Sequence, residues 1–95
     1  MVIIELQFKK TTVALAGNPY GKRIFDEQVR PKLSNSADEE VTITIPMQIT
    51  YVTSSFIQGF FDYWLRTMNC DEIKEKVIVK AGTDRIVSYI WDNLL

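Results

Sequence analysis

Hydrophobic and polar positions alternate at the start of the chain and again near its middle, which is typical of β-strands with one buried face. The hydrophobic positions are Ile4, Leu6 and Phe8 in residues 2–8, and Val41, Ile43 and Ile45 in residues 41–45. A hydrophobic run at residues 77–79 predicts another short strand. Residues 11–17 are rich in β-forming side chains, so they either continue the first strand or pair with it as a hairpin across Lys9 and Lys10.

Three other segments repeat their hydrophobic residues every three or four positions, which predicts amphipathic helices. The first covers residues 21–33, follows a chain break at "GNPYG", and should end or kink at Pro31. The second covers residues 56–68, where Gly59 is tolerable if a neighbouring strand approaches closely. The third follows Thr83, a predicted N-cap, and runs to Leu94. Residues 34–40 read as a polar loop and residues 47–53 as a short connection, and no element is predicted for residues 69–75.

The predicted elements follow the order β(β)αβαβα. Strands that alternate with amphipathic helices indicate an α/β domain, here with a partly parallel, mixed sheet covered by helices. Neither an internal repeat nor a linker interrupts the pattern, so residues 1–95 are interpreted as a single small domain.

The amino-acid composition argues against several classes of function. The net charge is −1, which argues against a nucleic-acid partner, because such proteins usually carry a clustered positive field. The chain contains no histidine, and Cys70 is its only cysteine, so it offers neither a His/Cys zinc site nor a histidine-based triad. We expect an ordinary packed thiol at Cys70, no metal, no cofactor and no catalysis. Hydrophobic runs are too short for a membrane span, and the start lacks a signal-peptide pattern, so a cytoplasmic location is expected.

The segments "GNPYGKRIFDEQVRPKL", "YVTSSFIQGFFDYWL" and "KVIVKAGTDRIVSYIWDNL" resemble small STAS-like domains of unknown function, with a small-residue step "SSF" opening the central helix. The resemblance spans residues 17–95 and extends distantly to the anti-sigma factor antagonists. In those proteins an ATP-dependent partner kinase phosphorylates a serine at the corresponding step, which controls partner binding. An aspartate commonly precedes that serine pair, whereas here Thr53 does.

Two interpretations of residues 53–56 are therefore open. In the structural one, Thr53 or Ser54 caps the central helix by accepting hydrogen bonds from its first N–H groups. In the functional one, Thr53, Ser54, Ser55 and Phe56 form a site of partner binding or phosphorylation. A phosphate would add about −1.5 to −2 charges at a positive helix end.

Two weaker candidates lie elsewhere. The turn "GNPYGKR" could cradle an anion with help from Lys22 and Arg23, although it matches no phosphate-binding motif and is better explained as an ordinary loop. The chain also carries many large hydrophobic and aromatic side chains, and a domain of this size need not bury all of them. Any surplus left exposed would form an interface, for which the candidates are Met47, Ile49, Tyr51 and Tyr63.

Two functions remain in competition. The first is a non-catalytic regulatory domain that binds another protein, for which the resemblance suggests an ATP-binding, kinase-like regulator, or binds a second copy of itself. The second is a small phage or mobile-element protein that inhibits a host complex by occlusion. Ser54→Asp and Ser55→Asp should abolish binding in the first case, whereas the occluding protein should tolerate at least one of them.

Overall fold

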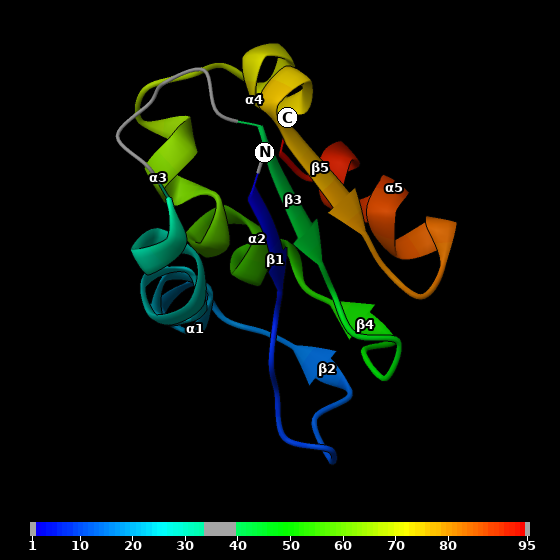
Figure 1. Ribbon diagram of the computed structural model, residues 1–95. Helices are drawn as coiled ribbons and strands as arrows, with labels where there is room; N and C mark the ends of the chain where they lie inside the picture. Colours follow the sequence, from blue (N-terminus) through cyan, green and yellow to red (C-terminus); the bar gives the residue numbers. More distant parts are fainter. Residues whose placement is uncertain (1, 34–39, 95) are drawn as a thin grey trace.

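The computed structural model of the chain describes residues 2–33 and 40–94 (Figure 1). Its main sheet has the strand order β1-β3-β5, with β1 at Val2–Glu5, β3 at Val41–Thr44 and β5 at Val77–Lys80. Both pairings are parallel, and their register places Ile3, Thr42 and Ile78 in one row across the sheet. Two further short strands, β2 (Ala14–Leu15) and β4 (Tyr51–Val52), pair in parallel with one another.

Helices connect these strands. Between β2 and β3 the chain forms α1 (Asn18–Ile24), a π-helical segment η1 (Phe25–Val29) and a 3-10 turn η2 (Arg30–Lys32). Between β4 and β5 lie α2 (Ser54–Phe60), α3 (Asp62–Leu65) and α4 (Cys70–Lys76), and the last helix is α5 (Asp84–Asp92). The predicted α/β class, a parallel sheet with interleaved helices, is confirmed.

The sheets differ from the prediction in two ways. All strand pairings in the described part of the chain are parallel, so the expected mixed sheet is wrong. Residues 11–17 do not form a hairpin with the first strand, because β2 pairs instead with β4, inside the segment predicted as a connection. The pairing is carried by long-range backbone bonds, from Thr50 N–H to the Val13 carbonyl (2.8 Å) and from Thr53 N–H to the Leu15 carbonyl (2.9 Å).

The helix boundaries also differ. The first helix begins at Asn18, inside the predicted break, because Pro19 fits a first helical turn, where its missing N–H costs nothing. The central helix is interrupted at Phe61, whose φ of −90° and ψ of 2° separate α2 from α3. Residues 70–76, where no helix was predicted, form α4 behind a capping box, in which the side chains of Asn69 and Glu72 each accept a hydrogen bond from the other residue's backbone N–H.

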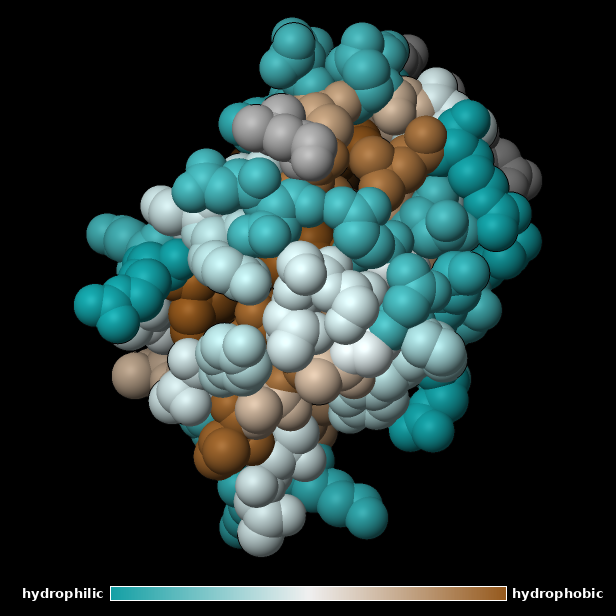
Figure 2. Space-filling model, turned by 180° about the vertical axis from the view of Figure 1, so that it is seen from behind, coloured by the Kyte–Doolittle hydropathy of each residue, from teal (hydrophilic) through white to brown (hydrophobic). Residues whose placement is uncertain are grey.

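The helices cover one face of the main sheet. In Figure 1, α2 lies behind the strands, α1 lies to the left of β1 and α5 to the right of β5, and no helix among the described residues crosses in front of these strands. On the covered face, the side chains of the strands and of their continuations are buried in the core with those of α2 and α5. They are Ile4, Leu6, Val41, Ile43, Ile45, Val77 and Val79. Seen from behind, the helix side of the molecule is mainly hydrophilic, with hydrophobic residues in separate patches (Figure 2).

Two glycines allow α1 and α2 to approach within backbone contact. A Cβ atom added to Gly59 would lie 2.1 Å from the Asn18 carbonyl oxygen, and one added to Gly21 would lie 2.3 Å from the Phe56 carbonyl oxygen. Both distances are far below van der Waals contact, and both obstacles are backbone atoms that cannot rotate away. The close neighbour of Gly59 is therefore a helix and not the strand that we expected.

We predict that Gly59→Ala lowers the free energy of unfolding by at least about 2–3 kcal/mol, because an added methyl group must push α1 away from α2. Urea unfolding monitored by the fluorescence of the two tryptophans would measure this change. In an unobstructed helix the same substitution stabilises by up to about 1 kcal/mol. A stabilised Gly59→Ala variant would thus contradict the close contact.

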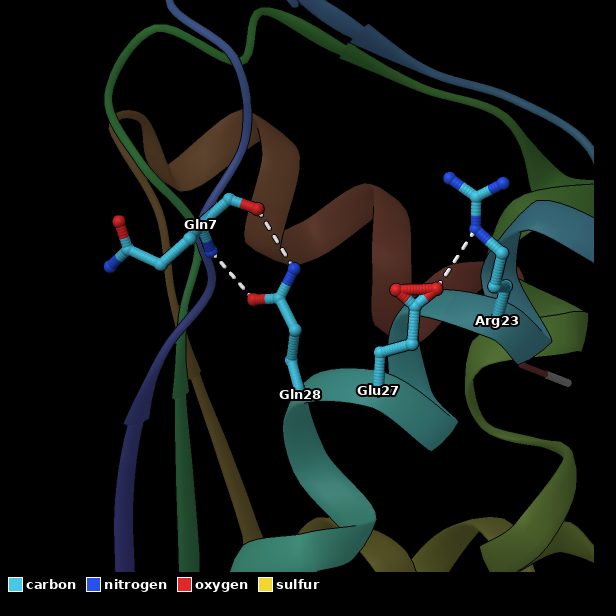
Figure 3. A network of polar contacts seen from close by, with 4 residues as sticks. All are labelled: Gln7, Arg23, Glu27 and Gln28. Atoms are coloured by element: carbon cyan, nitrogen blue, oxygen red, sulfur yellow. Dashed lines mark hydrogen bonds and ion pairs between the residues drawn. The ribbon is translucent and has the colours of Figure 1, made fainter.

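The side chain of Gln28 extends the main sheet beyond the end of β1, at Gln7. Its Oε1 accepts a hydrogen bond from the Gln7 N–H (2.7 Å), and its Nε2 donates to the Gln7 carbonyl (2.8 Å). The amide therefore makes the two bonds that a neighbouring strand would make. Figure 3 shows Gln28 reaching the Gln7 backbone, while Glu27, beside it on η1, turns toward Arg23. Gln28 thereby ties η1 to the end of the first strand.

We predict that Gln28→Ala lowers the free energy of unfolding by about 1–3 kcal/mol, since it removes two hydrogen bonds and leaves both Gln7 backbone groups without their protein partner. The matched control is Gln7→Ala, which removes an exposed side chain but keeps the backbone that Gln28 binds. Chemical unfolding should show a much smaller effect for the control, and equal effects would be inconsistent with this role of Gln28.

Candidate functional site at the start of helix α2

The candidate site lies where β4 ends and α2 begins, and its centre is Thr53. This residue is extended (φ −86°, ψ 157°) and occupies the N-cap position, where its Oγ1 accepts a hydrogen bond from the Phe56 N–H at 3.2 Å. The Gly17 N–H lies 3.4 Å from the same oxygen. Thr53 therefore joins α2 to the chain that enters α1, so its hydroxyl has a structural role, as the capping interpretation expects.

Ser54 and Ser55 form the first turn of α2, and both are exposed. The Ser55 Oγ lies 3.1 Å from the Thr53 Oγ1, so the two hydroxyls share a hydrogen bond. The first turn of α2 carries no acidic side chain. The cap at Thr53 thus leaves both serine hydroxyls accessible from solvent.

The fourth residue of the candidate step has a different position. Phe56 is buried and packs against the rings of Tyr20 and Phe60, with centroid distances of 5.7 and 5.9 Å. Its ring anchors α2 in the core. The expectation that Phe56 contributes directly to partner contact is wrong for this conformation, because helical spacing from Ser55 turns its side chain inward.

The residues proposed for an apolar interface also differ in their exposure. Met47 is 84% exposed and Tyr51 is 58% exposed, so both are available for contact. Ile49, in contrast, is buried in the core, and the prediction that it belongs to an exposed surplus is wrong. The burial of Ile49 is decided by its packing in the folded chain, which the pattern of residues 47–53 alone did not reveal.

Met47 and Tyr51 border a surface groove between the β3–β4 region and the beginning of α5. The groove continues along α5, and its main exposed side chains are Met47, Tyr51, Arg85 and Tyr89. Neither Arg85 nor Tyr89 was among the residues predicted from the sequence. Their spacing of four residues puts them on one edge of a helix, a signal present in the sequence. Their position opposite β4 depends on the fold.

Tyr63 does not belong to this groove. Its ring stacks on Phe25 at 5.3 Å, and the Arg30 guanidinium lies over it at 5.7 Å. It borders a mixed-charge cleft between α1–η1 and α2–α3, together with Lys22, Asp26, Asp62 and Arg66. The expected interface residues are therefore distributed over two separate places.

Lys22 and Arg23 do not form the anion site that the turn suggested. Both lie in the last turn of α1 and not at its N-terminus, where backbone N–H groups would favour an anion. Arg23 pairs with Glu27 at 3.1 Å and lies over the Tyr20 ring at 5.2 Å, whereas Lys22 borders the mixed-charge cleft. Gly21, the second glycine of the turn, is buried in the contact with α2.

The remaining chemical groups lie in ordinary surroundings. The Cys70 thiol donates to the Leu94 carbonyl at 2.9 Å and packs against the edge of the core. Within residues 2–33 and 40–94, no three acidic or cysteine side chains come together as a metal site, and no helix is long and apolar enough to cross a membrane.

Comparison of the chain with protein-family models, curated proteins and solved structures gives no match.

We predict that the three hydroxyl residues of the step differ in their effect on stability. Thr53→Ala should lower the free energy of unfolding by about 1–2 kcal/mol, because it removes the cap of α2 and the acceptor near the Gly17 N–H. Thr53→Ser keeps the oxygen and should recover most of that loss. Ser54→Ala and Ser55→Ala should each stay within about 0.5 kcal/mol of the wild type. Thermal and urea unfolding of the four variants would test this ranking, and a larger loss for either serine would refute it.

Proposed function

We propose that this protein is a non-catalytic regulatory domain that binds another protein through the surface around the β4–α2 step, with Ser54 or Ser55 as a phosphorylation switch. The observation that carries the proposal is the division of roles among the three hydroxyls. Thr53 caps α2, and the two serines beside it are exposed on a helix start.

The environment of the serines suits modification by another protein. Both belong to the first turn of α2, where the N–H groups and the dipole of the helix favour a negative charge. The hydrogen-bond partner of Ser55 is the Thr53 hydroxyl, which is not a base at neutral pH. The pair is thus better suited to receive a phosphate than to act as a nucleophile, which would need an adjacent base.

A contact surface lies next to the step. Tyr51 precedes Ser54 by only three residues and borders the groove that Met47, Arg85 and Tyr89 also border. Tyrosine, methionine and arginine are enriched in protein interfaces, because each combines a large apolar surface with a polar or adaptable group. A phosphate on Ser54 or Ser55 would add negative charge at the edge of this surface and repel an acidic partner. The resemblance to STAS-like domains supports the same arrangement.

The test is affinity capture from host lysate with ATP, using the wild type, a double Ser→Ala variant and a double Ser→Asp variant at positions 54 and 55. We expect phosphate on residue 54 or 55 in the recovered wild-type protein, measured by mass spectrometry. We also expect that the Ala variant retains one specific partner, that the wild type retains it only in its unphosphorylated fraction, and that the Asp variant binds it at least about tenfold more weakly. Tyr51→Ala should weaken the same capture without adding charge.

Ser88→Asp is the matched control, because Ser88 is an exposed serine on α5 that does not border the groove. It should capture the partner as the wild type does. If the serines are unmodified and the double Asp variant still binds its partner, the switch is refuted. A large host complex retained by every variant would instead favour the second function, inhibition by occlusion.

A further inference from the structure

The main sheet has one face that no described helix covers. All-parallel sheets are usually buried on both faces, because their crossover connections place helices there. Here the side chains on the uncovered face form two rows across the strands. The first row is Ile3, Thr42 and Ile78, and the second is Glu5, Thr44 and Lys80. Ile3 is 64% exposed and Ile78 is 44% exposed, whereas Thr42 between them is only 5% exposed, so the apolar surface in contact with water lies on the two outer strands.

The second row carries opposite charges at its two ends. Glu5 lies on the edge strand β1, Lys80 lies on the other edge strand β5, and Thr44 separates them. Both charged side chains are exposed. The strands β1 and β5 are two strand spacings apart, about 10 Å. One edge of the row is therefore acidic and the other is basic.

This pattern is complementary to itself, and we propose that the uncovered face binds a second copy of the chain, face to face, about a two-fold axis parallel to β3. Such an axis places β1 of one copy over β5 of the other. Glu5 then faces Lys80 of the second copy, and Ile3 faces Ile78, each pairing occurring twice. Packed sheets lie about 10 Å apart, a distance that a glutamate and a lysine can bridge together.

The charges also select this orientation over the other two-fold arrangement. An axis perpendicular to the strands would place β1 over β1 and β5 over β5. In that case Glu5 would not meet Lys80, and the strands of the two copies would run in opposite directions. Only the axis along the strands pairs every charge with its opposite and every isoleucine with an isoleucine. The proposed dimer is thus isologous, with the same surface used by both copies.

The interface is small, since each copy contributes three strands of four residues. Interfaces at the low end of the size range are weak, so a dissociation constant on the order of 100 μM is expected. The surface is also distinct from the β4–α2 step and its groove, because none of the six residues in the two rows borders that groove. Self-association can therefore be tested independently of the proposed switch.

The experiment is sedimentation equilibrium over a concentration range of about 10 μM to 1 mM. The wild type should show a monomer–dimer equilibrium. Glu5→Lys and Lys80→Glu should each raise the dissociation constant at least about tenfold, because each replaces two attractive pairs by two repulsive ones. Mixing these two variants in equal amounts should restore association, since every charged pair across the mixed dimer again joins one lysine to one glutamate.

A control must separate specific pairing from attraction between net charges. Glu75→Lys and Lys32→Glu change the net charge by the same amounts on exposed helical residues outside the sheet. Each alone should dimerise as the wild type does. Ile78→Thr keeps a β-branched side chain in the strand and should weaken the dimer, with circular dichroism confirming that it is folded.

Three results would overturn the proposal. The first is a wild type that stays monomeric at about 1 mM. The second is a dimer that Ile78→Thr and both charge changes on the sheet leave intact. The third is failure of the mixture of Glu5→Lys and Lys80→Glu to associate more tightly than either variant alone, which would exclude the axis along β3.

Discussion

The close contact between α1 and α2 is the constraint on which the rest of the structure depends. Gly21 and Gly59 each face a backbone carbonyl of the other helix, so any side chain at either position would separate the two helices. These helices belong to the two successive crossovers of the main sheet, β1 to β3 and β3 to β5. The distance between α1 and α2 therefore affects how both crossovers lie on the sheet. Four aromatic rings pack around the contact, those of Tyr20, Phe25, Phe56 and Phe60.

The geometry of the candidate site depends on this contact between α1 and α2. Because α1 lies against α2, the Gly17 N–H comes within 3.4 Å of the Thr53 Oγ1, from a position 36 residues earlier in the chain. Gly17 has a φ of +97°, a conformation that other residues rarely adopt. The pairing of β2 with β4 joins the same two segments just before Gly17 and Thr53. The hydroxyl of Thr53 thus has a structural role as a hydrogen-bond acceptor, and this role distinguishes Thr53 from the exposed Ser54 and Ser55.

Among the described residues, helices cover only one face of the main sheet, so the domain has two surfaces of different character. The outer surface of the helices is mainly hydrophilic (Figure 2), as expected for amphipathic helices whose apolar side faces the core. The opposite face of the sheet combines exposed isoleucines with threonines and one charge of each sign. Gln28 binds the outer edge of the chain at Gln7, two residues after the end of β1, so the face of the sheet, and not this part of its edge, is accessible.

Much of the fold could be predicted from local pattern. Alternation identified β3, a hydrophobic run identified β5, and helical spacing identified α5. Thr83 was predicted correctly as the N-cap of α5, where its Oγ1 accepts from the Ile86 N–H. Two other local signals mark the starts of helices. The capping box of Asn69 and Glu72 marks the start of α4, and Pro19 after Gly17 marks the start of α1.

The sequence by itself determined which segments form the principal strands and helices and which of their sides are buried, because periodicity and caps depend on residues within a few positions of one another. It also placed hydroxyl residues at the start of α2. Only the tertiary structure decided that β4 is a strand, that Gly59 meets a helix, and that Ile49 and Phe56 are buried while Met47 and Tyr51 are exposed. These outcomes depend on the approach of backbones that are tens of residues apart, and two-residue strands are too short to carry a periodic signal.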